Sequence, residues 1–409
     1  MSPELHALRR ALRLRFLAAC AVASSAIAIW IAHADLFRRF WFNDLSYFWA
    51  AGRMWGDGVS PYVDGYIARA NALIPTEHIY SAFYYAPAIR PLAELLALFP
   101  METAANLFLI VNIAALVLAC GLLGKTAARF APRPGAVVWA AAFLFVACVV
   151  LRHPLVVVAI GQITILLLLA FSLFLYAIAA ERPRFAIPAI LLLLLKPHFG
   201  IPVVVFAALH APLRRPLVVA LVLYGALTLY GLALWPEASL RGFFANIAAY
   251  ADHPRHDPAH ASGLGQILAS FGLRTPTAVL VCLLSLGAVF ASGAATPRER
   301  VLAAAFLPAW TLFVGPNHME DFAVLAPLLL VAILGAPRRL GLIAFGLFLV
   351  GRGHEMTAAL PIDRAAFLDV RTAIHTIGLG ALVVAAAATA RPFSIPLTLL
   401  RRRFAAAAR

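Results

Sequence analysis

Residues 156–180 read VVVAIGQITILLLLAFSLFLYAIAA and contain no charged side chain. A helix that crosses a bilayer needs about 20 consecutive, mostly apolar residues, so this run is long enough to span a membrane. Comparable runs recur at 101–124 and 216–235. Because helices satisfy all their backbone hydrogen bonds internally, repeated runs of this kind predict an all-α, polytopic transmembrane bundle.

The composition agrees with a lipid environment. Hydrophobic residues make up 63% of the 409-residue chain and charged residues only 12%, whereas soluble domains carry about 25% charged residues. A formal net charge of +15 would suggest nucleic acid in a soluble protein. Here the basic residues form short clusters between apolar runs, which is the topology signal of membrane proteins. We therefore expect a membrane-lipid environment and no nucleic-acid partner.

Basic clusters such as Arg9–Arg15 and Arg401–Arg403 mark the expected cytoplasmic side. Placing them all inside predicts about twelve crossings with both termini in the cytoplasm. The run Phe16–Ala34 would be a signal peptide in a competing interpretation, but its length favours a retained helix. The expected spans lie near 14–33, 101–124, 135–151, 156–180, 185–196, 198–211, 216–235, 276–295, 301–315, 321–336, 340–352 and 368–390.

Polar and aromatic residues collect in the segments expected outside the cytoplasm, chiefly 35–100 and 236–274. The first begins with an aromatic-rich stretch that predicts helices lying in the membrane interface. Asp44 stands in this stretch, beside Trp41 and Trp49. Partial desolvation would make its carboxylate a general base, and a helix N-cap is the alternative. The segment 252–260 is interpreted as a solvated loop or as a cover over substrate.

Lys196 separates two apolar runs of about 12 residues, each too short to span alone. Together with Pro197 it predicts a bent or re-entrant hairpin. A lysine in such a place is expensive unless it snorkels to the interface or meets an anion. Snorkelling and phosphate binding, with His198 next to the lysine, both stay open.

Two further polar positions interrupt apolar runs. Gln162 begins a span, where its amide would bond a sugar or a neighbouring helix. The turn Asn317–Asp321 contains His318 and two acidic residues, but without a specific metal-ligand spacing. The four cysteines lie in apolar runs without paired spacing. We therefore expect neither a metal site nor a disulfide framework.

Several motifs stand in a characteristic order over about residues 30–340. They are Asp44-Leu-Ser-Tyr-Phe-Trp-Ala-Ala-Gly52, Gly58-Val-Ser-Pro-Tyr62, Tyr84-Tyr-Ala-Pro87, Gly161-Gln-Ile-Thr164, Leu195-Lys-Pro197 and the His318 turn. This ordered set resembles the GT-C superfamily of membrane glycosyltransferases, most closely glycosyltransferase family 87. That family includes polyprenol-phosphate-mannose-dependent α-mannosyltransferases. The Tyr85-Ala86-Pro87 sequence and the stretch Ser262–Gln266 depart from the family pattern and leave the substrate specificity open.

The resemblance implies a GT-C bundle in a bacterial-type plasma membrane, with the active site facing the periplasm or exterior. The chain would be one membrane domain, with a catalytic core over 1–215 and further transmembrane helices over 216–409. It would transfer a sugar, mannose as the first expectation, from a polyprenyl-phosphate donor to a hydroxyl of a glycolipid or glycan, with inversion and without a cofactor.

The same resemblance implies roles for individual residues. Asp44 would be the base, and Lys196, His318 and Arg90 would bind the donor phosphate. Further substrate contacts are expected from Trp41, Trp49, Tyr62, Tyr85, Gln162, His198 and Asp321. The main alternative is a transporter or flippase of a lipid-linked sugar, which would favour internal repeats and polar groups at mid-membrane. Polar residues at one face of this chain favour an interfacial enzyme.

Overall fold

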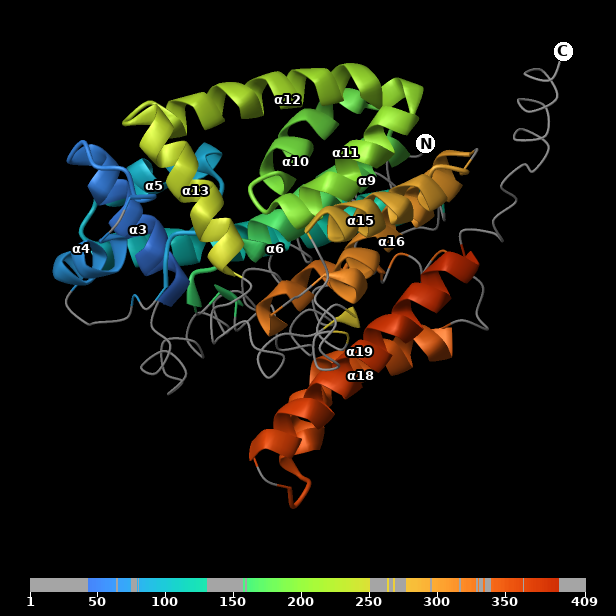
Figure 1. Cartoon of the computed structure of the whole chain (residues 1–409). Helices are drawn as coiled ribbons and strands as arrows, with labels where there is room; N and C mark the ends of the chain where they lie inside the picture. The colour runs from blue at the N-terminus through green and yellow to red at the C-terminus, as the bar shows by residue number, and fades with distance from the viewer. Residues whose placement is uncertain are drawn as a thin grey trace, which may run out of the picture.

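The computed structural model describes residues 43–130 except 64, 75–78 and 80, residues 157–250 except 159, residues 277–315 except 295, and residues 318–389 except 329, 331–333, 335–339 and 363, together with 263, 264 and 268. Within these ranges every regular element is a helix (Figure 1). The all-α prediction is therefore confirmed for the described part of the chain. Trp41, the expected spans 14–33 and 135–151, and the segment 252–260 lie outside it.

The outer segment predicted at 35–100 is helical where it is described. It contains α3 (Asn43–Gly56), α4 (Tyr66–Leu73), the 3-10 helix η1 (Pro87–Ile89) and α5 (Arg90–Ala97). These helices share their own apolar core, in which Phe48, Trp55 and Phe83 are almost completely buried. The cluster lies at one end of the molecule (Figure 1).

A second, larger core joins the helices that follow. They are α6 (Met101–Phe130), α9 (Thr164–Ala179), α10 (Ala186–Leu193), α11 (Pro197–Leu209), α12 (Ala211–Leu232), α15 (Thr277–Ala291), α16 (Pro297–Val314), η4 (Met319–Leu325), α18 (Leu340–Ala358) and α19 (Arg364–Thr389). Helix α13 (Pro236–Tyr250) follows α12 and packs against the first core instead, through Phe243. In Figure 1, α18 and α19 lie side by side as a C-terminal pair. Helix α9 packs against α6, α10, α16 and η4, so its first turn stands where several elements meet.

Two of the described helices, Met101–Phe130 and Ala211–Leu232, are long and apolar enough to cross a bilayer unaided. Shorter apolar helices cover Thr164–Ala179, Pro183–Leu193, Pro197–Leu209, Val279–Ala291 and Leu342–Gly351. These lengths are consistent with a helical membrane protein. The number of about twelve crossings stays a prediction.

The helix break expected around Lys196 is present. Helix α10 ends at Leu193 and α11 begins at Pro197, with Lys196 in an extended conformation between them. Proline suits the first position of a helix because the amide hydrogen it lacks would have no partner there. A Cβ on Gly200 would lie 2.8 Å from Leu194 Cδ2, which shows how closely the start of α11 folds back on the end of α10.

Candidate functional site

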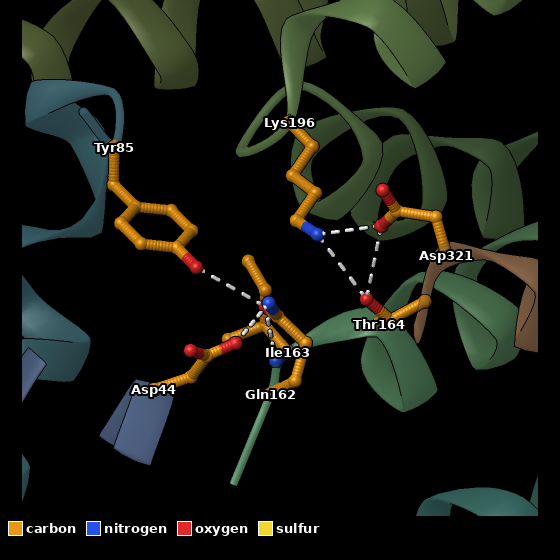
Figure 2. A network of polar contacts seen from close by, with 7 residues as sticks. All are labelled: Asp44, Tyr85, Gln162, Ile163, Thr164, Lys196 and Asp321. Atoms are coloured by element: carbon orange, nitrogen blue, oxygen red, sulfur yellow. Dashed lines mark hydrogen bonds and ion pairs between the residues drawn. The ribbon is translucent and has the colours of Figure 1, made fainter. Parts of the chain in front are cut away.

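A network of polar contacts forms around residues 162–164, just before and at the start of α9 (Figure 2). Gly161 precedes it with a φ of 68°, a left-handed conformation that glycine adopts without strain. The next residues enter the helix, so Gln162 and Thr164 stand close together on a short, rigid piece of backbone. In Figure 2, contacts from Gln162 lead toward Asp44 and Tyr85, and contacts from Thr164 lead toward Lys196 and Asp321.

The Gln162 amide links the start of α9 to α3 and to Tyr85. Its Oε1 accepts hydrogen bonds from the Tyr85 hydroxyl at 3.2 Å and from the Ile163 backbone N–H at 3.0 Å. Its Nε2 donates to Oδ2 of Asp44, in the first turn of α3. Because two donors meet Oε1, the amide orientation is set and its N–H group faces the carboxylate. Gln162 is only 4% exposed, so this contact is shielded from solvent.

Lys196 forms a buried ion pair on the other side of the network. Its Nζ lies 2.7 Å from Asp321 Oδ1 and donates a second hydrogen bond to Thr164 Oγ1 at 3.2 Å. The side chains of Lys196 and Asp321 are only 11% and 5% exposed. The Lys196 ammonium is therefore buried and paired with a carboxylate of the chain itself. Phosphate binding by Lys196 stays a prediction.

The local fold explains why these groups meet. Lys196 occupies the break between α10 and α11, where the backbone leaves the helical path. Asp321 lies in the first turn of η4, which packs on α9 beside Thr164. A buried ion pair is retained at low cost only when further hydrogen bonds satisfy its charged groups. The Thr164 hydroxyl, 3.5 Å from Asp321 Oδ1, provides such a bond to the lysine.

Two histidines lie within electrostatic reach of the Asp321 carboxylate. Both His198, at the start of α11, and His318, directly before η4, interact with it. Among the described residues, the buried His198 Nε2 has no hydrogen-bond partner. The chain thus brings three of its predicted phosphate and substrate residues, Lys196, His198 and His318, to one carboxylate.

Other predicted site residues have structural partners in the described part of the chain. Arg90 donates hydrogen bonds of 2.8 Å to Glu94 and to the Tyr230 carbonyl, and its guanidinium lies 4.2 Å from the Tyr230 ring centre. Trp49 is buried and donates to the Phe99 carbonyl at 2.9 Å. These contacts join α3 to Phe99, just beyond α5, and join α5 to α12, where the Arg90 guanidinium is engaged.

Tyr62 holds the backbone of Tyr85 in place. Its hydroxyl donates to the Tyr85 carbonyl at 2.7 Å, and its ring packs against Phe83. Burial raises the pKa of Tyr62 well above its usual value, so the phenol stays protonated and remains a donor. Tyr62 therefore acts on the network through the position of Tyr85, whose own hydroxyl reaches Gln162.

Two residues of the network were absent from the sequence-based candidates. Thr164 lies within the Gly161–Thr164 motif, and its hydroxyl bonds Lys196. Asn112 is fully buried in α6 and donates to the Gln162 carbonyl at 3.4 Å. Asn112 lies in the middle of the apolar run 101–124, whose other amide, Asn106, stands near its start. This position was a signal that could have found Asn112, because polar groups within spans usually have a specific partner.

The described residues include no group of three or more His, Cys, Asp or Glu side chains arranged to hold a metal ion. The site therefore consists of a carboxylate beside an amide, and a lysine beside a second carboxylate and two histidines. The first pair suits proton transfer, and the second group suits an anion.

The sequence model of glycosyltransferase family 87 matches residues 83–316. Tyr85, Gln162, Thr164 and Lys196 lie inside this region, whereas Asp44, His318 and Asp321 flank it. Neither a curated protein nor a solved structure matches the chain significantly.

Proposed function

The chain belongs to glycosyltransferase family 87, and from this premise we propose that it transfers a sugar from a polyprenyl-phosphate donor to a hydroxyl acceptor on the non-cytoplasmic face of a membrane. The observation that carries the proposal is the series of contacts from Asp44 through Gln162 and Thr164 to Lys196. It connects a candidate base to a candidate phosphate ligand through three consecutive residues.

Asp44 acts as the general base in this proposal. The acceptor oxygen attacks the anomeric carbon while its proton passes to the Asp44 carboxylate. The Gln162 amide holds one oxygen of that carboxylate in place by its hydrogen bond. The new bond joins the anomeric carbon to the acceptor oxygen, and attack opposite the leaving group inverts the anomeric configuration.

The bond that breaks joins the anomeric carbon to a phosphate oxygen, which leaves with the electron pair. Negative charge then grows on the phosphate, and fixed positive groups in a water-poor site stabilise such charge strongly. Lys196 supplies the ammonium, and His198 and His318 supply imidazoles near it. A phosphate ester is a good leaving group, so the reaction needs neither a metal nor a cofactor.

The family resemblance supports the proposed substrate classes. Mannose is the first candidate sugar, and a glycolipid or glycan is the candidate acceptor, in a bacterial-type plasma membrane. Tyr85 and His198 stand next to the two halves of the network and are proposed to contact the sugar and the phosphate. Trp49, Tyr62 and Arg90 are proposed to act indirectly, by holding together the segment 43–100 and its junction with α12. The family match favours a transferase over a transporter.

The proposal is tested by sugar transfer with purified protein in nanodiscs. Radiolabelled polyprenyl-phosphate mannose serves as donor, with parallel donors carrying glucose or arabinose, and a membrane-lipid extract serves as acceptor. We expect a labelled product whose formation requires Asp44 and whose mass identifies the acceptor. Absence of transfer from every donor, combined with movement of the lipid-linked sugar across the bilayer, would replace the transferase with a flippase.

A further inference from the structure

We propose that Asp321 competes with the substrate phosphate for Lys196, and that this competition expels the phosphate product after transfer. The inference deepens the proposed function, on which it rests. It assigns to Asp321 a role distinct from sugar binding: the carboxylate is an internal counter-ion of the lysine, and its charge sets which phosphates the site retains.

The geometry supplies the competition. Lys196 Nζ lies 2.7 Å from Asp321 Oδ1, inside the range of charge-assisted hydrogen bonds, and both groups are buried. A phosphate that engages Lys196 must share the ammonium with this carboxylate or displace it. Asp321 also interacts electrostatically with His198 and His318. These neighbours give the carboxylate other partners when the ammonium turns toward phosphate.

The charges of donor and product differ in a way that makes this competition useful. The donor is a phosphodiester with one negative charge. Once the sugar leaves, the lipid phosphate is a monoester, which carries between one and two negative charges at neutral pH because its second pKa is about 6. A site holding only the Lys196 charge would bind the product more tightly than the donor. The negative charge of Asp321 cancels the positive charge of Lys196, and it repels the additional negative charge of the product.

Product release limits the turnover of many enzymes, so a charge that weakens product binding raises kcat. The expected signature of losing that charge is a split between kinetic constants. Asp321→Asn should lower KM for the donor, lower kcat, and leave the rate of a single turnover close to wild type. If the Lys196–Asp321 pair only stabilised the fold and phosphate did not contact Lys196, the variant would produce no such split.

The direct test measures binding of two defined probes to the full-length protein in nanodiscs. Farnesyl phosphate represents the dianionic product. Farnesyl methyl phosphate, a diester with one negative charge, represents the donor. We expect the wild type to bind both probes with similar affinity. Asp321→Asn should bind farnesyl phosphate at least about tenfold more tightly than wild type, because a unit charge within about 4 Å interacts strongly even in a partly polar interior. Asp321→Glu, which keeps the charge, should resemble wild type.

The wild-type comparison needs no mutation and therefore tests the inference even where Asp321→Asn does not fold. A wild-type preference of tenfold or more for farnesyl phosphate over its diester would overturn the inference. So would equal or weaker binding of farnesyl phosphate by folded Asp321→Asn. Transfer activity separates the two proposals. If the wild type transfers sugar but lacks these affinities, the transferase proposal holds and the proposed role of Asp321 fails. If it has the expected affinities but transfers no sugar, the anion site holds and the transferase proposal fails.

Discussion

The ammonium of Lys196 and the carboxylate of Asp321 lie 2.7 Å apart although 125 residues separate them in the chain. This pair is buried between the break at Lys196, the start of α9 and η4. Removing one member of a buried ion pair leaves an uncompensated charge, which is more damaging than removing both. The pair therefore makes separate predictions for stability and for activity.

Lys196→Met should lower the free energy of unfolding by about 3–5 kcal/mol, because Asp321 would be left as a buried, unpaired carboxylate. The double variant Lys196→Met with Asp321→Asn should recover most of that loss. Neither variant should use a polyprenyl-phosphate donor, because both lack the ammonium. Unfolding of the purified protein in detergent, followed by tryptophan fluorescence, measures the first effect, and donor kinetics measure the second.

A matched control is Lys125→Met, which removes a lysine from an exposed position on α6. It should change stability by less than about 0.5 kcal/mol and leave the donor KM unchanged. Recovery of transfer in the double variant would remove Lys196 from the phosphate site.

Asp44→Asn should reduce transfer by at least about 100-fold, because the amide cannot accept the acceptor proton and general-base catalysis contributes about that much. The protein should still fold, since Gln162 can donate to the amide oxygen as it does to the carboxylate. Initial rates with saturating donor test the prediction. Asp57→Asn, at an exposed position just beyond α3, should retain full activity. Near wild-type turnover in Asp44→Asn would exclude this residue as the base.

Gln162→Glu should shift the acid limb of the pH–rate profile to higher pH. The new carboxylate would face Asp44, and a neighbouring like charge makes a carboxylate bind its proton more strongly. The base would then be free of its proton only at higher pH, so activity at neutral pH should fall. The profile of kcat/KM measured across the acid range tests this effect.

Ser172→Ala is the control for that shift. Ser172 is also buried on α9, but its hydroxyl bonds the carbonyl of Leu168 within the same helix. It should leave the profile in place. A Gln162→Glu profile that overlays the wild type would show that Gln162 does not influence the base.

The helices and the membrane class were predictable because both follow from local sequence. The apolar run 101–124 lies within α6, which is long enough to cross a bilayer, whereas the run 156–180 forms only the shorter helix α9. Pro197 favours a helix start directly after Lys196, because the amide hydrogen that proline lacks would have no partner there. The individual polar positions were also visible, since charged and amide groups are rare inside apolar runs. Gln162 and Lys196 stand out for this reason, whereas Asp44 stands out as a carboxylate in an aromatic-rich stretch.

Their pairings were not predictable, because they depend on how distant helices pack. Gln162 reaches Asp44 across 118 residues, and nothing in either motif specifies the other. The family resemblance implied that Arg90 binds phosphate, which stays a prediction, but the sequence did not indicate its partners Glu94 and Tyr230. An ionic side chain indicates that a partner exists, but only the tertiary structure identifies the partner.

Helix α3 packs closely on α5, and we predict that this contact fixes the position of Asp44. A Cβ on Gly52 would lie 2.0 Å from the Ala93 carbonyl oxygen and 2.9 Å from Ala97 Cβ. Because the nearest atoms belong to backbone, they cannot turn aside as a flexible side chain would. Gly52→Ala should therefore push α3 away from α5 and lower the free energy of unfolding by about 1–3 kcal/mol. It should also reduce transfer, by displacing Asp44 from Gln162.

Gly56→Ala is the matched variant in the same helix. No atom lies within 4 Å of the position that a Cβ would take there, so the added methyl group meets open space. This variant should be neutral or slightly stabilising, because alanine favours a helix more than glycine does. Thermal unfolding and transfer rates of the two variants, measured together, test the close contact. Equal behaviour of both would mean that α5 does not hold α3, and with it Asp44, in place.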